Sequence, residues 1–397
     1  MTTLLFNRQP VYDRNLQVIG YEIVSEKPEN EVPVPGGLSS VHRLLSELGG
    51  EDVNTLASEG RLFLDSMPHE LADGEWILPP EKSVFQFQLP ASETPDLSLI
   101  NLQSLHERRP QIALTGLGGG SNSELMNMAD VLKMDVAATD LSDLELTVDQ
   151  MRRYNGKLLA DKIESQKKYQ VCHDLGFDYF QGFFYCEPVE VSRRAVPASQ
   201  AVIMRLLAQI QDPNVDLREL EKIISQDAAL CFRLLRYLNS AAIGLTQKID
   251  SVSRAVNLLG LEPLKIWCSV ILLSRIEGKP LELMKTSLTR GRMCQTLAEH
   301  GPAVNSSSSF MAGLLSLLPA YMDRPMEDIV GELPLTDEIA NGLVTGEGQV
   351  GAVLGSAIDY ERGEWKKLEQ SAFEKPVLRA SYLDAVNFTE ESFKRLR

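Results

Sequence analysis

Apolar and polar positions follow two different patterns along the chain, and the change between them falls near residue 190. Before it, short runs of β-type alternation predict strands at residues 16–24, 61–65, 84–89, 112–114, 157–160 and 177–180. Residues 123–131 and 148–155, between some of these runs, have helical spacing. Strands that alternate with helices predict an α/β domain with a largely parallel sheet or barrel, whose functional side chains lie at the carboxyl ends of the strands.

Helical spacing dominates the second half of the chain. Asp216 and Glu219 form a capping pair that predicts one helix start, and Asp227 predicts the next. Leucines then recur on one face of that second helix, at positions 230, 234 and 238. The second half is therefore expected to be an all-α domain.

The two halves meet in residues 187–200, which contain two prolines and no helical period. The length of 397 residues is enough for two domains with a hydrophobic core each. We therefore expect an α/β domain at residues 1–190, a linker at 191–199 and an all-α domain at 200–397.

Composition and charge exclude several classes of function. Lys and Arg number 39 and Asp and Glu 55, which gives a formal net charge of −16. A surface this acidic repels nucleic acid backbones and anionic lipid headgroups. The longest strongly apolar run, residues 266–273, is far shorter than the ~20 residues that span a bilayer. With no signal-peptide pattern and five scattered cysteines, we expect a cytoplasmic protein without membrane insertion and without a nucleic-acid partner.

Candidate chemistry is sparse when it is judged from residue types alone. From residue 174 onwards the chain has a single histidine, His300, so a histidine-rich metal site cannot form in the second half. The glycine-rich segment 116–121 matches neither a dinucleotide-binding nor a P-loop pattern and favours a strand-to-helix turn. Carboxylates near the predicted strand ends are Glu22, Asp65, Asp135, Asp161 and Glu164. Their spacing alone does not select a site.

Collinear motifs in both halves resemble two known domain families. The first half resembles the EAL domain, a cyclic di-GMP phosphodiesterase fold, in RQPVYDRNLQVIGYEIV, LKMD, LLADKIES and LGFDYFQGFFYCEP. The second half resembles the HDOD domain in ELEKIISQDAALCFRLLRYLNSAAIGL, KIDSVSRAVNLLGLEPLKIW and FMAGLLSLLPAYMDRPMEDIVGELPL. Together they are similar to the EAL–HDOD signalling proteins of bacteria. The resemblance implies a shortened, modified TIM-like barrel followed by an all-α HDOD domain with a degenerate HD-like fold.

The EAL resemblance implies a site for two Mg²⁺ or Mn²⁺ ions at the strand ends, where they activate a water against the phosphodiester. At six positions of this site the chain has the residue of the EAL family or a related one: Glu22, Asp65, Lys133, Asp161, Glu164 and Gln181. Neutral residues replace metal-binding carboxylates at Gln88, Thr115 and Gly116. Two such ions bring a charge of about +4, so the loss of three carboxylates predicts that the metal site does not assemble.

Two further departures concern the nucleotide and the second domain. Glu26 stands where the EAL family has an arginine that holds the nucleotide phosphate, which places a like charge beside an anion. Ser316 and Leu317 stand where an active HD phosphohydrolase has His–Asp. We therefore expect a degenerate EAL domain without catalytic residues, an HDOD domain without metal ligands, and no cofactor.

Three hypotheses for the function follow. The leading one is a non-enzymatic signalling or scaffold protein that binds other signalling proteins in cyclic di-GMP-linked control of motility, biofilm formation, chemotaxis or secretion. The second is a cyclic di-GMP receptor without hydrolysis, which would use Gln9, Gln181 and backbone contacts next to Glu26. The third is a weak residual cyclic di-GMP phosphodiesterase, with one Mg²⁺ or Mn²⁺ ion held by Glu22, Asp65 and Asp161.

Overall fold

The structure is a computed structural model, and it divides the chain into two compact units, Met1–Tyr185 and Cys186–Arg397. Within them it describes residues 3–26, 39–48, 50–66, 79–88, 111–116, 123–137, 139–189, 198–238, 251–301 and 305–396. The expected boundary at residue 190 lies five residues after this division. Of the expected linker at 191–199, residues 191–197 lie outside the described part, and a helix begins at Ala198.

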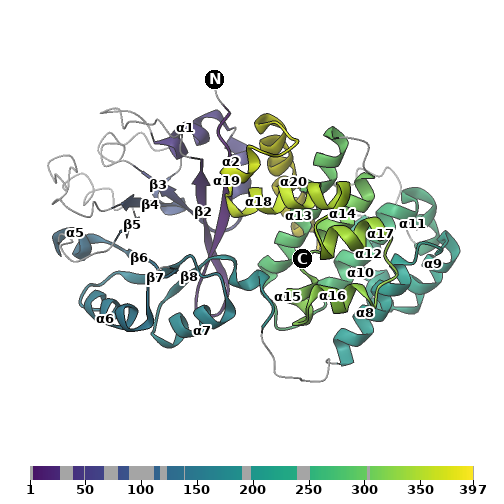
Figure 1. Ribbon diagram of the computed structural model, residues 1–397, viewed down its shortest axis with the longest axis horizontal. Helices are drawn as coiled ribbons and strands as arrows, with labels where there is room; N and C mark the ends of the chain where they lie inside the picture. Colours follow the sequence, from purple (N-terminus) through teal and green to yellow (C-terminus); the bar gives the residue numbers. More distant parts are fainter. Residues whose placement is uncertain are drawn as a thin grey trace. The chain divides into compact units, whose positions relative to one another are not determined.

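The first unit is a closed barrel of eight strands with helices around it (Figure 1). The strands are β1 Phe6–Tyr12, β2 Val18–Ser25, β3 Arg61–Asp65, β4 Ser83–Gln88, β5 Gln111–Thr115, β6 Val131–Asp135, β7 Lys157–Asp161 and β8 Tyr179–Gln181. The helices are α1 Ser40–Glu47, α2 Gly50–Ala57, α5 Ser123–Met128, α6 Leu141–Met151 and α7 Gln166–Asp174, with short 3-10 turns at Pro80–Lys82 and Phe183–Cys186. Strand β1 is antiparallel to β2 and to β8, and β2 through β8 are parallel to their neighbours. A largely parallel barrel was predicted, and this prediction is confirmed.

A layer of apolar side chains fills the barrel interior. Its buried members are Val11, Phe63, Val84, Ala113, Val131 and Leu159. Because successive side chains of a strand point to opposite faces, the residue two positions further along faces the same interior. In β3, β4, β6 and β7 that residue is polar: Asp65, Gln86, Lys133 and Asp161. The alternation therefore brings polar groups from four strands together at the carboxyl end of the barrel.

Not every element of this unit was expected. The hydrophobic pattern did not predict β1 and β6, although the EAL resemblance included the LKMD of β6, and the helical stretch expected at 123–131 ends at Met128, before β6 begins. The helix expected at 148–155 is the last part of α6, which starts at Leu141. The remaining strand predictions fall on β2, β3, β4, β5, β7 and β8.

The second unit is helical throughout its described residues, as predicted. Its helices are α8 Ala198–Gln211, α9 Leu217–Gln226, α10 Ala228–Leu238, α11 Val252–Leu259, α12 Leu261–Leu273, α13 Leu281–His300, α14 Ser306–Leu315, α15 Leu318–Met322, α16 Met326–Val330, α17 Asp337–Val344, α18 Gly348–Arg362, α19 Trp365–Leu368 and α20 Lys375–Leu396. The Asp216 carboxylate accepts a hydrogen bond of 2.8 Å from the Glu219 backbone N–H, which caps α9 as expected. In α10, whose cap is Asp227, the leucines at 230, 234 and 238 are fully buried.

Helices α13 and α14 cross at two glycines. A Cβ atom on Gly313 would lie 2.7 Å from the Cα atom of Gly291, which is closer than real Cβ contacts come. We therefore expect Gly313→Ala to push the helices apart and to lower stability by about 1–3 kcal/mol, as measured by calorimetry. Gly355→Ala in α18 is the matched control, because a Cβ there meets no atom within 4 Å and alanine favours a helix by about 1 kcal/mol. Equal unfolding temperatures for both variants would contradict the expected crowding.

Among the described helices, none is both long and apolar enough to cross a bilayer. The expectation of a cytoplasmic location stays a prediction.

Candidate active site at the barrel mouth

Six side chains from six strands form a hydrogen-bonded group at the carboxyl end of the barrel, here called the mouth cluster. Its members are Glu22, Asp65, Gln86, Lys133, Asp161 and Gln181. The Lys133 ammonium is its centre, with Nζ 2.6 Å from Glu22 Oε2 and 3.2 Å from Asp161 Oδ2. Lys133 and Glu22 are both buried, and their side chains are 6% and 11% exposed.

Two glutamines complete the hydrogen bonds of the cluster. The Gln86 amide N–H group donates to Glu22 Oε1 at 2.6 Å and to Asp65 Oδ1 at 3.3 Å, and its Oε1 accepts from Lys133 at 3.5 Å. Gln181, which is 1% exposed, donates from Nε2 to Glu22 Oε2. Gln181 Oε1 is buried and has no hydrogen-bond partner among the described residues. A buried acceptor without a donor is costly, so this atom is suited to accept from a bound molecule.

The charges of the cluster shift one another's pKa values. Burial acts to raise the pKa of Glu22, but Lys133 and three hydrogen bonds outweigh it and hold that pKa below its ordinary value. Burial acts to lower the pKa of Lys133, yet Glu22 and Asp161 together raise it above the usual range. The pKa of Asp161 is raised, by burial first and by the nearby Glu22 charge, against the opposing charge of Lys133. Glu22 is therefore a stable anion, and Asp161 accepts a proton more readily than an exposed aspartate.

The mouth cluster does not fit a site for two divalent ions. Lys133 already pairs with the carboxylates of Glu22 and Asp161, and a metal cation at the same place would meet the like charge of its ammonium group. Within the ranges that the structure describes, no three His, Cys, Asp or Glu side chains are close enough to hold a metal ion. The arrangement therefore offers one fixed ammonium group where the EAL resemblance implies metals.

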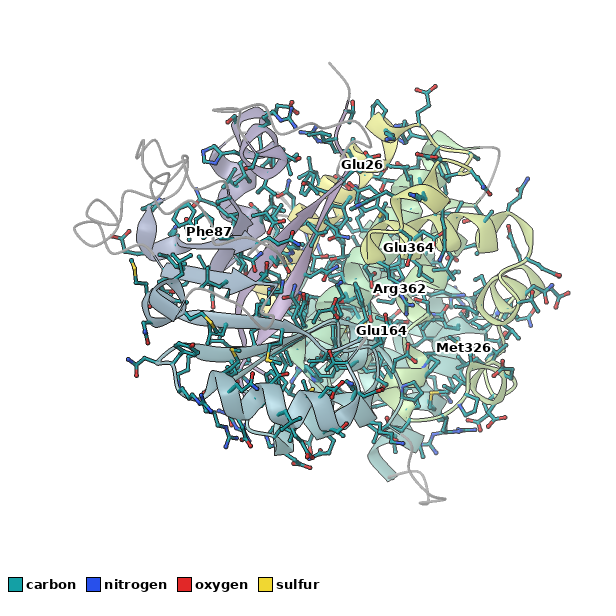
Figure 2. All side chains as sticks on the ribbon, turned by 60° about the vertical axis from the view of Figure 1, so that its left-hand side comes forward. Glu26, Phe87, Glu164, Met326, Arg362 and Glu364 are labelled. Carbon is teal, nitrogen blue, oxygen red and sulfur yellow. The ribbon has the colours of Figure 1, made fainter. Side chains whose placement is uncertain are left out.

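The structure changes the assignment on β4. Gln88, which was expected at the lost metal-binding position, is exposed at the end of the strand, whereas Gln86 is buried and contacts Glu22. The signal for Gln86 lay in the sequence, because it stands two positions after the interior residue Val84. Phe87, labelled in Figure 2, is the buried neighbour between the two glutamines.

Other expected site residues lie outside the mouth cluster. Thr115 donates its hydroxyl to the Phe87 carbonyl at 3.3 Å, and Gly116 after it has a φ of 73° that favours glycine. Glu164 is exposed beyond β7, and Glu26 is half-buried beyond β2 (Figure 2). Gln9 is half-buried and pairs in register with Glu22.

The expected remnant of an HD site in the helical unit is part of an ion-pair network. Ser316 accepts from Arg290 Nη1 at 2.8 Å and donates to the Gly313 carbonyl at 2.7 Å. Arg290 also binds Glu361 through two hydrogen bonds of 3.0 and 2.7 Å. Leu317 is buried, with 4% exposure. These residues hold helices together, and their polar groups are turned toward one another.

Comparisons with known proteins match both halves of the chain. Residues 196–319 match the HDOD domain family. The cyclic di-GMP phosphodiesterase CdgJ of Vibrio cholerae is 27% identical over 388 residues, which cover 94% of this chain and 88% of that protein. The uncharacterized protein YuxH of Bacillus subtilis is 25% identical and covers 96% of this chain and 97% of its own.

Solved structures with EAL domains are similar at a low level. The Bacillus subtilis YkuI protein, described in complex with substrate cyclic di-GMP and calcium, has a TM-score of 0.35 and 17% identity, covering 64% of this chain and 73% of its own. An EAL domain protein of Listeria monocytogenes has a TM-score of 0.33 and 18% identity, covering 46% of this chain and 87% of its own. These scores are too low to establish a shared fold, so the fold rests on the barrel topology.

The expectation that the chain is not an enzyme is contradicted. It followed from missing metal ligands, but a relative that matches 94% of the chain is a cyclic di-GMP phosphodiesterase. The doubt about cyclic di-GMP as a ligand loses its support for the same reason, while the protein partners and the controlled behaviour stay predictions. A closed barrel precedes residues 196–319, which match the HDOD domain family, so the order of the two domains is similar to that of the EAL–HDOD signalling proteins.

Proposed function

We propose that the barrel is a cyclic di-GMP phosphodiesterase with low turnover, acting at the mouth cluster. The observation that carries the proposal is the relationship to the Vibrio cholerae phosphodiesterase along 94% of the chain. It is supported by the mouth cluster, which brings the side chains of Glu22, Lys133 and Asp161 together toward the carboxyl end of the barrel, where barrel enzymes have their functional groups.

The cluster supplies groups that suit a phosphodiester. Lys133 Nζ is a fixed cation that attracts a phosphate oxygen, and the partnerless Gln181 Oε1 accepts a hydrogen bond from an N–H group of the nucleotide. Asp161, with its raised pKa, is the candidate general base that takes a proton from the attacking water. Because Glu22 and Asp161 already neutralise Lys133, its attraction for substrate is weakened, and this accounts for the low turnover that we propose.

Hydrolysis by the purified full-length chain tests the proposal. We expect slow conversion of cyclic di-GMP to its linear dinucleotide. Liquid chromatography measures this product in parallel reactions that contain Mg²⁺, Mn²⁺ or EDTA. Asp161→Asn should reduce turnover by about 100-fold or more, because a positioned general base contributes 10²–10⁴-fold. The matched control is Asp174→Asn, at an exposed aspartate that ends α7, which should leave turnover unchanged.

Two results would count against this function. Product formation that is equal in Asp161→Asn and the unchanged chain would point to a contaminating enzyme. Absence of product under all three ionic conditions, from protein that calorimetry shows to be folded, would remove phosphodiesterase activity altogether.

A further inference from the structure

The barrel has a cavity at the end opposite to the mouth cluster. Its volume is about 340 Å³, within the range of small-molecule sites. It opens among the first residues of the strands, where Arg61 begins β3, Gln111 begins β5 and Lys157 begins β7. The inner wall includes Phe63, which is a buried member of the apolar layer, and Tyr179, which is half-buried and packs against that layer.

The rim of this cavity carries two basic side chains and one acidic side chain. Lys157 pairs with Asp178 at 3.0 Å, so its charge is largely balanced. Arg61 donates only to the Glu81 backbone carbonyl, at 3.3 Å, and no carboxylate among the described residues pairs with it. The lining carboxylate, Asp130, is exposed and accepts a hydrogen bond from the Ile112 backbone N–H at 2.9 Å. The cavity therefore combines the half-buried ring of Tyr179 with a guanidinium group that no carboxylate in the described part of the chain pairs with.

The cavity is a separate site from the mouth cluster. Strand β3 has Arg61 at one end and Asp65 at the other, and β7 has Lys157 and Asp161 in the same way. Four residues of extended strand span about 13 Å. The apolar layer lies between the two ends, so a molecule at one end cannot touch the side chains of the other.

We propose that this amino-end cavity binds a small aromatic or heteroaromatic molecule that carries an acidic group. The ring packs on the half-buried Tyr179, and the acidic group binds the Arg61 guanidinium, because a guanidinium forms paired hydrogen bonds with carboxylates and phosphates. Gln111 and Asn127 add amide donors and acceptors at the rim. The site is independent of the proposed phosphodiesterase activity.

Calorimetric titration of the full-length chain with 2-naphthoate, and with the uncharged 2-naphthamide, tests the proposal. We expect saturable 1:1 binding of the acid and at least about tenfold weaker binding of the amide, because the amide lacks the charge that Arg61 recognises. Arg61→Ala should weaken the binding of 2-naphthoate by a similar factor. Arg218→Ala, at an exposed arginine of α9, should leave the affinity for 2-naphthoate unchanged. Asn127→Trp, which narrows the cavity from its exposed rim, should abolish binding without touching the barrel core.

Competition separates the two ends of the barrel. An excess of cyclic di-GMP and the variant Asp161→Asn should both leave 2-naphthoate binding unchanged. Displacement by cyclic di-GMP, equal affinity for acid and amide, equal binding by Arg61→Ala and Arg218→Ala, or no heat at millimolar acid would each overturn the proposal.

Discussion

Replacing Lys133 by methionine is expected to lower the free energy of unfolding of the barrel by about 3–5 kcal/mol at pH 7. The ammonium group is the shared partner of Glu22 and Asp161, at 2.6 and 3.2 Å, and all three side chains are largely buried. Without it, two buried carboxylates lie close together with no cation to balance them. Urea denaturation followed by circular dichroism measures the loss.

The loss should depend on pH in a direction set by Glu22. In the unchanged protein the pKa of Glu22 lies below its ordinary value of 4.5, so its contribution to stability is present above pH 4.5 and is lost as the pH falls through the folded pKa. In Lys133→Met only the hydrogen bonds from Gln86 and Gln181 still oppose the burial effect, so we expect the folded pKa of Glu22 to rise above 4.5 and stability to fall as the pH rises. The difference between the two proteins should therefore be smaller at pH 5 than at pH 7.

An exposed ion pair of the same barrel provides the control. Lys157 pairs with Asp178 at 3.0 Å, but its side chain is 59% exposed, so Lys157→Met should cost less than about 1 kcal/mol. If both lysine variants lost the same stability, or if the loss from Lys133→Met did not vary with pH, the central role of its charge would be wrong.

The sequence predicted those parts of the fold in which local pattern and final environment agree. Strand β3 is one example, because it is a short apolar run, 62–64, between two polar residues. Helix α9 is another, because its cap, Asp216, acts on a neighbour three residues away. Strand β1 was missed because polar residues fill it: Asn7 is fully buried, and Arg8 donates to the carbonyls of Thr55 and Leu56 and packs 4.3 Å from the Tyr21 ring. Partners so far along the chain leave no local pattern.

The same distance in sequence explains what was missed at the candidate site. Lys133 and Glu22 are 111 residues apart, so no spacing rule could pair them, although the family resemblance named both. A lysine in the middle of β6 also breaks apolar alternation, which hid that strand. For Gln86 the alternation with Val84 was sufficient, but the resemblance assigned the lost ligand to Gln88.

In the helical unit, replacing Arg290 and Glu361 together is expected to cost less stability than either replacement alone. Arg290 of α13 is 5% exposed and binds both oxygens of Glu361 in α18. Either Arg290→Met or Glu361→Met removes one charge and leaves the other buried, which should cost about 3–5 kcal/mol. The double variant Arg290→Met with Glu361→Met leaves no buried charge of this pair and should recover most of that loss.

Calorimetric unfolding of the full-length chain compares the four proteins of this double-mutant cycle. Arg292→Met with Asp384→Met is the matched pair, because its hydrogen bond of 2.7 Å joins side chains that are 26% and 45% exposed, and its single variants should each cost less than about 1 kcal/mol. A double Arg290 and Glu361 variant as unstable as the sum of its single variants would show that the two side chains act separately. Recovery of stability in the double variant would instead mean that apolar side chains of similar size stabilise the packing beside Ser316 nearly as well as the ion pair does.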